Sequence, residues 1–189
     1  MRVPRLAIQG FCVAFLYLSS LAVAQAAIIP FFGTRDSFGG TPPAPSPPLC
    51  PGAAFLAIPS GPGDSNLGAF THDDSHCVAM GTVYDGVFNW DFDQGDTIFG
   101  TFSGFIQVAN GLTTFDEDFV ITGGSGRFVN ASGSFNGIGV VTFTPSGANT
   151  HMDFEGSITL VPEPATLALL LLCLPWLLLR RRRVRVTKV

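Results

Sequence analysis

Residues 96–108 read Asp-Thr-Ile-Phe-Gly-Thr-Phe-Ser-Gly-Phe-Ile-Gln-Val, and this stretch decides the fold. Alternate residues form one face of Ile, Phe, Val and glycine: Ile98, Gly100, Phe102, Gly104, Ile106 and Val108. The opposite face is mostly polar, with Thr97, Thr101, Ser103 and Gln107 beside Phe99 and Phe105. A period of two is typical of a β-strand that buries one face, and it does not fit the period of a helix.

The same period recurs in three further stretches. Their apolar faces are Phe88, Trp90 and Phe92; Gly133, Phe135, Gly137, Gly139, Val141 and Phe143; and Met152, Phe154, Gly156, Ile158 and Leu160. Turn-forming residues at 93–95, 110–111, 123–126 and 145–147 separate the strands. A face that alternates Phe with Gly suits a small closed barrel, because glycine permits the curvature and Phe fills the interior. We therefore predict an all-β fold, a small antiparallel β-barrel of about six to eight strands, with a β-sandwich as the alternative.

The region between residues 27 and 160 is strongly acidic. It contains Arg35 and Arg127 against thirteen Asp and Glu residues, so its formal charge is 2 − 13 = −11, whereas the full chain of 189 residues carries −4. Phosphate contacts need clustered Lys and Arg, so we expect no nucleic-acid partner.

Composition divides this region into two parts. Residues 39–52 contain six prolines, which disfavour helix and central strand, so we expect residues 27–52 to form a Pro-rich arm or linker. Residues 53–160 are rich in Phe, Gly, Thr, Ser and Asp and form the predicted β-barrel domain.

Residues 1–26 have the three parts of a secretory signal peptide. Arg2 and Arg5 are followed by an apolar run over 11–23 and by small residues at Ala24 and Ala26, after which signal peptidase would cleave. We expect a signal helix that directs the chain to the Sec export machinery. The alternative is an uncleaved membrane helix, for which the run is short.

Residues 161–189 form a second predicted targeting segment, at the C-terminal end of the sequence. Pro162, Glu163 and Pro164 precede an apolar run over 165–179, and four arginines follow: Arg180, Arg181, Arg182 and Arg183. Fifteen residues rise about 22 Å as a helix, less than the roughly 30 Å of a bilayer core, and Pro175 interrupts the run. The arginines favour the cytoplasmic side, which places the domain across the membrane. We expect a hydrophobic helix, and a single-pass anchor is the plain alternative.

This tail resembles the PEP-CTERM sorting signal of Gram-negative bacteria, which combines a Pro-Glu-Pro motif, a hydrophobic segment and an arginine cluster in this order. The resemblance implies recognition by an exosortase, a membrane transpeptidase that removes the tail. It implies transient insertion in the inner membrane through 165–179 and export to the cell surface or the exopolysaccharide matrix.

Residues 121–133 read Ile-Thr-Gly-Gly-Ser-Gly-Arg-Phe-Val-Asn-Ala-Ser-Gly. This segment is similar to the Gly-Gly-Thr-Gly-x-Phe…Ala-x-Gly segment of allene oxide cyclase and dirigent proteins, and residues 95–104 also look like secreted bacterial relatives of that superfamily. The resemblance implies an eight-stranded antiparallel barrel. It implies no activity, because no catalytic residue of the family maps onto a matching motif here.

Glu117 is the candidate acid or base. It lies in register with the apolar face of a strand, formed by Phe115, Phe119 and Ile121. A carboxylate inside an apolar barrel has a raised pKa and can transfer protons. The alternative is that a bulge turns Glu117 outward or that it lies at a wet barrel mouth, since an unpaired buried carboxylate is costly.

Two further clusters point less clearly to a site. His72 and His76 are four residues apart, a spacing that holds zinc on a helix, but this stretch is not helical and lacks a third His, so we expect a solvated loop. Asp91, Asp93 and Asp96 do not have the spacing of a full calcium loop, and we expect a polar turn. No metal or cofactor is therefore predicted.

Processing at both ends would leave two cysteines, Cys50 and Cys77, because Cys12 lies in the signal and Cys173 in the tail. Two cysteines in an exported chain favour one disulfide, which would tie the Pro-rich arm to the domain. The alternative is a pair of buried free thiols.

The sequence thus predicts an exported, exosortase-processed protein of the cell surface or extracellular matrix, with a non-catalytic structural or interaction barrel. No Ser-His-Asp arrangement, nucleophile elbow or phosphate-binding loop is present. Exopolysaccharide is a candidate partner. The alternatives are a barrel that binds a small apolar ligand and a cyclase-like enzyme that uses Glu117.

Overall fold

The alternating sequence pattern forms nine β-strands and two short 3-10 turns in the computed structural model, which describes residues 26–40, 50 and 55–161. The strands are β1 (Ala27–Gly40), β2 (Phe55–Ala57), β3 (Ser60–Ser65), β4 (Gly68–Ala79), β5 (Thr82–Phe92), β6 (Thr97–Ala109), β7 (Leu112–Ser125), β8 (Ser132–Thr144) and β9 (Gly147–Leu160). The turns are η1 (Asp93–Gly95) and η2 (Gly126–Phe128).

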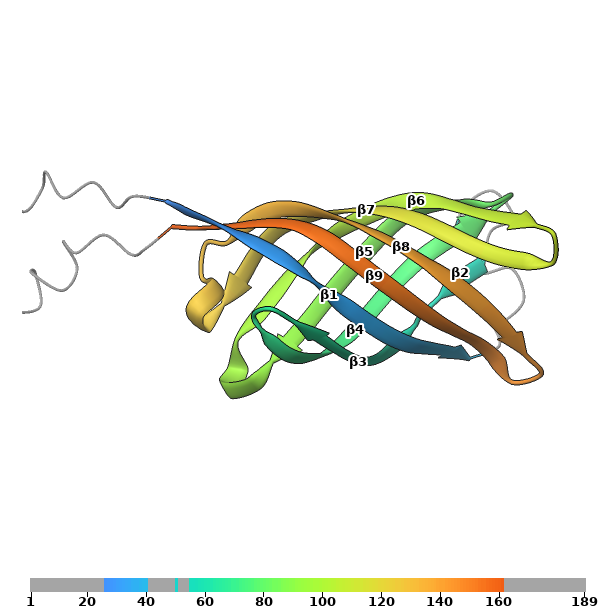
Figure 1. Ribbon diagram of the computed structural model, residues 1–189, viewed down its shortest axis with the longest axis horizontal. Helices are drawn as coiled ribbons and strands as arrows, with labels where there is room; N and C mark the ends of the chain where they lie inside the picture. The colour runs from blue at the N-terminus through green and yellow to red at the C-terminus, as the bar shows by residue number, and fades with distance from the viewer. Residues whose placement is uncertain (1–25, 41–49, 51–54, 162–189) are drawn as a thin grey trace, which may run out of the picture. The chain divides into compact units, whose positions relative to one another are not determined.

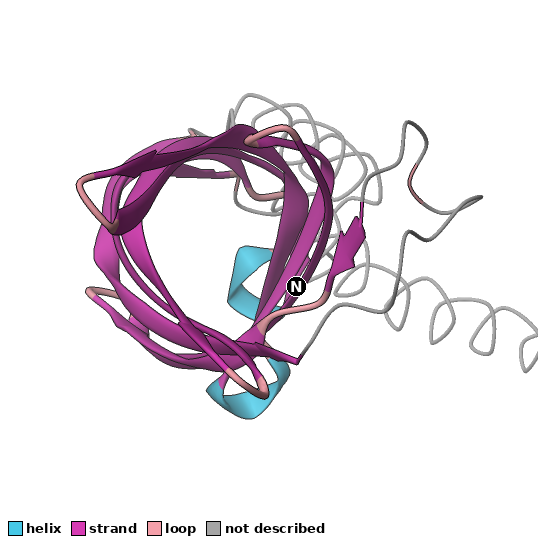
Figure 2. Cartoon of the chain, turned by 90° about the vertical axis from the view of Figure 1, so that its right-hand side faces the viewer, coloured by secondary structure: helices cyan, strands magenta, loops and turns pink. Residues whose placement is uncertain are grey.

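The strands close into a barrel. Antiparallel pairing runs in the order β4, β3, β1, β9, β8, β7, β6, β5, and β5 pairs back onto β4. The short β2 pairs with β4 beyond the end of β3, so β2 and β3 share one place in a ring of eight (Figure 1). Viewed from one end, the strands form a closed ring (Figure 2). The predicted antiparallel barrel is confirmed, and closure excludes the alternative of a sandwich.

The barrel begins at Ala27, in the range predicted to be a Pro-rich arm. β1 pairs with β9 along its whole length, from Ala27 opposite Leu160 to Gly40 opposite Gly147. Sequence reasoning missed this strand because two of its inward residues, Arg35 and Ser37, are polar and both are buried. Residues 41–49 and 51–54 of the predicted arm lie outside the described residues.

Both predicted targeting segments also lie outside the described residues, except for Ala26 and Val161. The predicted signal helix and hydrophobic helix, with the sorting residues Pro162, Glu163 and Pro164 and the four arginines, therefore stay predictions. Within the described part of the chain, no helix is long and apolar enough to cross a membrane.

Aromatic side chains fill much of the interior, with Trp90 at their centre and fully buried. The Trp90 ring contacts the rings of Phe31, Phe70, Phe88, Phe119, Phe135 and Phe154 at centroid distances from 4.4 to 6.2 Å. Glycine on the inward face makes room for them. A Cβ on Gly100 would lie 1.9 Å from the carbonyl oxygen of Val120 and 2.8 Å from the Phe88 ring, so no larger residue fits there.

A disulfide joins Cys50 to Cys77, with their Cα atoms 5.6 Å apart. Both cysteines are buried in a small cluster with Leu56, Ala79 and Tyr84, separate from the aromatic core. The bond fixes residue 50, which precedes β2, to the wall of the barrel at β4.

Replacing Cys50 and Cys77 together by Ala is expected to lower the free energy of unfolding by about 3 to 4 kcal/mol, because the bond spans 27 residues and restricts the unfolded chain. Urea unfolding followed by Trp fluorescence measures the loss. As a control, the wild type unfolded in a thiol reductant should fall to the stability of the double variant. If the oxidised wild type and the double variant had the same midpoint, the expected contribution of the bond would be disproved.

Candidate functional site

Four ionisable side chains meet inside the barrel. Arg35 comes from β1, His72 and Asp74 from β4, and Glu117 from β7, and all four are buried. Each occupies an inward position of its strand, where period-two alternation places every second side chain. We call these four residues the buried charge cluster.

Arg35 is the centre of the buried charge cluster. Its Nη1 donates a hydrogen bond to Asp74 Oδ2 and lies 3.1 Å from His72 Nδ1, and its Nη2 lies 3.7 Å from Glu117 Oε2. Trp90 Nε1 donates to the other carboxylate oxygen of Asp74 at 3.3 Å. One guanidinium faces two carboxylates, so Arg35 compensates a single negative charge, and the second carboxylate is tolerated in the interior in its neutral form.

Glu117 points inward, as its register with Phe115 and Phe119 predicted. It pairs regularly between Gly104 on β6 and Gly137 on β8, so no bulge turns it outward. Burial raises the pKa of its carboxyl from 4.5 to about 7, and the positive charge of Arg35 partly opposes this rise. The residue is 5% exposed, so it is sealed inside the protein rather than placed at a wet barrel mouth.

The stretch that contains His72 and His76 is part of β4, and the expected solvated loop is wrong. His72 and Asp74 are buried beside Arg35, which comes from a strand far away in the sequence. The sequence around the two residues does not show this partner, so they were expected to be solvated. Among the described residues, no group of three or more His, Cys, Asp or Glu side chains could hold a metal ion. In the predicted polar turn, Asp96 forms an ion pair with Arg127, its Oδ2 3.0 Å from Arg127 Nε.

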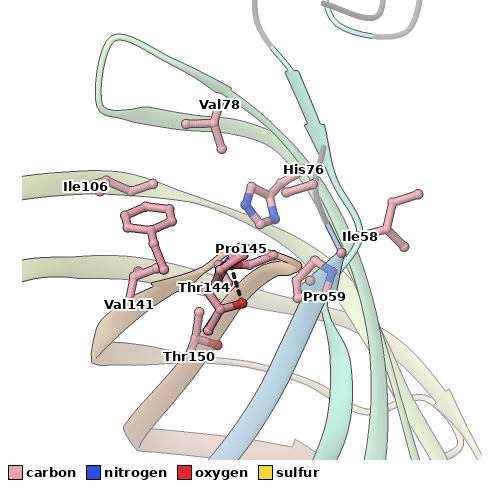
Figure 3. A pocket seen from close by; sticks show the side chains of 15 residues that line it. Ile58, Pro59, His76, Val78, Ile106, Val141, Thr144, Pro145 and Thr150 are labelled. Carbon is pink, nitrogen blue, oxygen red and sulfur yellow. Dashed lines mark hydrogen bonds between the residues drawn. The ribbon is translucent and has the colours of Figure 1, made fainter. Parts of the chain in front are cut away.

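A pocket of about 270 Å³ opens at the end of the barrel where β8 turns into β9 (Figure 3). We call it the mouth pocket. It is lined by Gly39, Gly40, Ala57, Ile58, Pro59, His76, Val78, Ile106, Val141, Phe143, Thr144, Pro145, Gly147, Ala148 and Thr150. The lining is largely apolar and contains no Asp, Glu, Lys or Arg. Neither Glu117 nor Arg35 lines it, so the buried charge cluster and the mouth pocket are distinct features.

His76 reaches into the mouth pocket from β4 (Figure 3). Its ring packs edge-on against Phe102 with the centroids 5.3 Å apart. Burial lowers the pKa of the imidazole from 6.5 to about 4, with Asp74 opposing and Arg35 adding to the decrease. The ring is therefore neutral near pH 7. The sequence analysis did not predict that His76 lines a pocket. The signal that could have shown it is the period of two formed by His72, Asp74, His76 and Val78, which is typical of a strand with these residues on one face.

No protein-family model matches the chain, and no curated protein is significantly similar to it. Among solved structures, the chain is similar to the pterocarpan synthase dirigent protein GePTS1 with 10% sequence identity and a TM-score of 0.33, over 72% of this chain and 86% of that chain. A similarity at this TM-score carries no argument about activity. The assignment of the barrel therefore rests on the strand pairing itself.

Glu117→Gln is expected to stabilise the protein relative to the wild type increasingly as the pH rises. The pKa of Glu117 is higher in the folded chain, so its contribution to stability is fully present below pH 4.5 and is lost as the pH rises through about 7. Gln stays neutral throughout. The difference in unfolding free energy should grow by about 3 kcal/mol between pH 4 and pH 8, measured by urea unfolding.

The matched control is Asp118→Asn, which removes an exposed carboxylate from the same strand. It should show no comparable growth across the same pH series. Titration of His76 occurs in both the wild type and the variants and cancels in the comparison. A constant difference between Glu117→Gln and the wild type from pH 4 to pH 8 would contradict the raised pKa.

Proposed function

We propose that this chain is an exported cell-surface protein whose barrel binds a small apolar molecule in the mouth pocket. The observation that carries the binding function is the pocket itself, an apolar cavity of about 270 Å³ that also contains one neutral imidazole. Ligand sites are commonly concave, mostly apolar and furnished with few polar groups. The volume lies at the small end of such sites, which favours a small ligand.

The geometry favours binding over catalysis. A cyclase-like enzyme that uses Glu117 would need this carboxyl to reach the substrate, yet Glu117 is sealed beside Arg35 and does not line the mouth pocket. The aromatic side chains around Trp90 support a structural role for the rest of the barrel, because they leave that part of the interior packed.

Val141→Trp is expected to weaken binding at the mouth pocket, since Val141 lines it and the larger side chain occupies part of the cavity. 1-Aminonaphthalene, a small, neutral and mostly apolar dye, serves as the fluorescent probe, and its affinity should fall at least tenfold. The matched control is Val140→Trp, the adjacent residue of β8, which is exposed on the outside of the barrel.

Val140→Trp should bind the dye like the wild type. Circular dichroism checks that both variants keep their strands, because extra volume inside a packed protein costs about 1 to 3 kcal/mol. If the dye bound none of the three proteins, or bound Val141→Trp as tightly as the wild type, the proposed binding function would be rejected.

Export and sorting are supported by the sequence at both ends of the chain. Residues 1–26 have the features of a signal peptide, and the Pro-Glu-Pro motif, apolar run and arginine cluster of 161–189 resemble a PEP-CTERM signal. The disulfide between Cys50 and Cys77 is compatible with an oxidising compartment. Under this proposal signal peptidase and an exosortase process the chain, and the barrel reaches the cell surface or the exopolysaccharide matrix.

The intact mass of the protein recovered from the surface of its host, without reduction, tests this processing. We expect a chain that begins at Gln25 or Ala27 and ends near Pro162 to Pro164. As a control, a variant with Ala in place of Pro162, Glu163 and Pro164 should keep the apolar run and the arginines. A wild-type mass that retains residues 165–189 would instead establish a permanent anchor.

A further inference from the structure

The end of the barrel that carries the mouth pocket exposes a ring of apolar side chains. The antiparallel strand order places the β4–β5, β6–β7 and β8–β9 turns together at this end, at the right in Figure 1. Five apolar side chains on or beside these turns and after β2 are 54% to 102% exposed: Ile58, Met80, Val108, Leu112 and Phe143. We call these five residues the apolar rim. Exposed apolar groups gathered in one place mark an interaction site, whereas single ones do not.

Met80 occupies a backbone conformation that suits other residues better. Its φ is 48°, in the left-handed region, at the turn between β4 and β5, where Asn, Asp or Gly is the usual residue. The matching position of the β6–β7 turn is indeed an asparagine, Asn110, with φ 53°. The Met80 side chain is 102% exposed, so no packing in the barrel offsets the unfavourable conformation. Folding does not account for an apolar side chain here, which points to a contact outside the barrel.

The mouth end carries no formal charge at pH 7. The described residues that form it contain no Asp, Glu, Lys or Arg: 37–40, 56–59, 76–84, 105–115 and 139–150. The charge of 2 − 13 = −11 between residues 27 and 160 therefore lies on the rest of the barrel. A partner that covers the mouth end is not held by ion pairs, and a partner with an anionic surface is repelled by the remainder of the domain.

The nearest exposed carboxylates limit how deeply the apolar rim can enter a nonpolar layer. Asp36, Asp85 and Asp116 lie four, three and four residues from the mouth-end limits of β1, β5 and β7. A strand advances about 3.3 Å per residue and is tilted by about 40° in a barrel, so these carboxylates lie about 7 to 10 Å below the strand ends. Insertion to that depth leaves them in water. It is also the depth that apolar faces reach in the interface of a bilayer.

A lipid bilayer fits this end better than a protein does. The apolar rim stands on separate turns with the opening of the mouth pocket between them, so its surface has protruding points around a hollow. A protein partner, a second copy included, would have to match these points and fill the hollow to reach the packing of a stable interface. Fluid acyl chains adapt to any such shape and require no charge on the protein.

We propose that the mouth end docks on a lipid bilayer without net charge, with the apolar rim inserted by about 7 to 10 Å and the mouth pocket open toward the acyl chains. The inference goes beyond the binding function proposed above and does not depend on a ligand in the pocket. It adds a route by which an apolar molecule passes between bilayer and pocket without crossing water.

Methyl NMR tests which end of the barrel docks. Protein recovered from its host with [methyl-¹³C]methionine is added to phosphatidylcholine nanodiscs that contain a nitroxide-labelled lipid. The resonance of Met80, at the apolar rim, should be lost through paramagnetic broadening. Ile28→Met places a second reporter at a position that is 72% exposed at the opposite end of β1, and its resonance should remain. This comparison distinguishes docking from attachment through either predicted targeting segment.

Two charge substitutions assign docking to the apolar rim. Val108→Asp combined with Leu112→Asp should weaken binding to phosphatidylcholine nanodiscs about tenfold or more, because a carboxylate resists transfer into a nonpolar layer. The matched control is Ile28→Asp, at the opposite end, which should bind like the wild type. Phosphatidylglycerol nanodiscs should bind the wild type more weakly than phosphatidylcholine, and added salt should reduce this difference by screening the repulsion.

The pocket variant separates this inference from the binding function. Val141→Trp should lose affinity for 1-aminonaphthalene and keep its affinity for nanodiscs. The variant with Val108→Asp and Leu112→Asp should do the reverse, since neither residue lines the mouth pocket. Dye binding is measured without lipid.

Three results would refute docking through the apolar rim. They are loss of the Ile28→Met resonance in place of that of Met80, unchanged nanodisc affinity of the doubly charged variant, and tighter binding to phosphatidylglycerol than to phosphatidylcholine. If the wild type bound no nanodisc but dimerised in analytical ultracentrifugation, and the charged variant were monomeric, the apolar rim would be a contact between copies instead. The reporter and lipid comparisons need no charged variant, so they decide the question even if that variant does not fold.

Discussion

The burial of Arg35 is the constraint on which the rest of the barrel interior depends. A guanidinium keeps its charge inside a protein, so it requires an anionic partner at close range. Asp74 on β4 supplies this partner to Arg35 on β1, and Glu117 on β7 lies 3.7 Å from the guanidinium. The ring centroids of Trp90 and Phe119 lie 5.9 and 5.7 Å from the guanidinium carbon. Three strands, no two of which are neighbours in the sheet, are thereby held in one register across the lumen. A shift of any one strand by a single residue would move its charge to the outside and leave the others uncompensated.

The region around Trp90 and the mouth pocket have different roles because their side chains differ in size and polarity. Around Trp90, aromatic rings at close spacing fill the space, and glycine on neighbouring strands admits them. In the mouth pocket the inward residues are smaller, among them Val78, Ile106 and Val141, and they leave a cavity. The barrel is therefore stabilised by its packed part, so that the pocket can remain unfilled without loss of the fold. This division of the interior is what makes a binding role compatible with a small domain.

Strands were predictable from the sequence where their inward residues are apolar. In β6, β8 and β9, Phe, Ile and Val alternate with glycine, and the period of two is visible by inspection. Glu117 was found in the same way, because Phe115 and Phe119 flank it in register. The sequence pattern did not predict β1 and β4, because their inward positions carry Arg35, His72, Asp74 and His76. Such polar residues are expected on the surface. Their burial depends on partners 37 and 39 residues away, and no local pattern reports such a distant pairing. The mouth pocket and the buried nitrogen of His76 that lacks a hydrogen-bond partner among the described residues arise only when the barrel closes. Neither could therefore be predicted from a local sequence pattern.

The positions of Ala27 and Leu160, the two ends of the barrel strands, bear on whether the proposed export and the proposed binding can be combined in one chain. Ala27 and Leu160, at which the barrel joins the two predicted targeting segments, pair with each other at one end of β1 and β9. Gly40 and Gly147, at the opposite ends of the same two strands, line the mouth pocket. Both strands are fourteen residues long and span the barrel wall, so the chain enters and leaves at the end that does not carry the pocket (Figure 1). The residues of the barrel to which the two predicted targeting segments are attached therefore lie at the opposite end from the mouth pocket. Processing at the chain ends and binding at the mouth then impose independent demands on the sequence, and the same barrel can satisfy both.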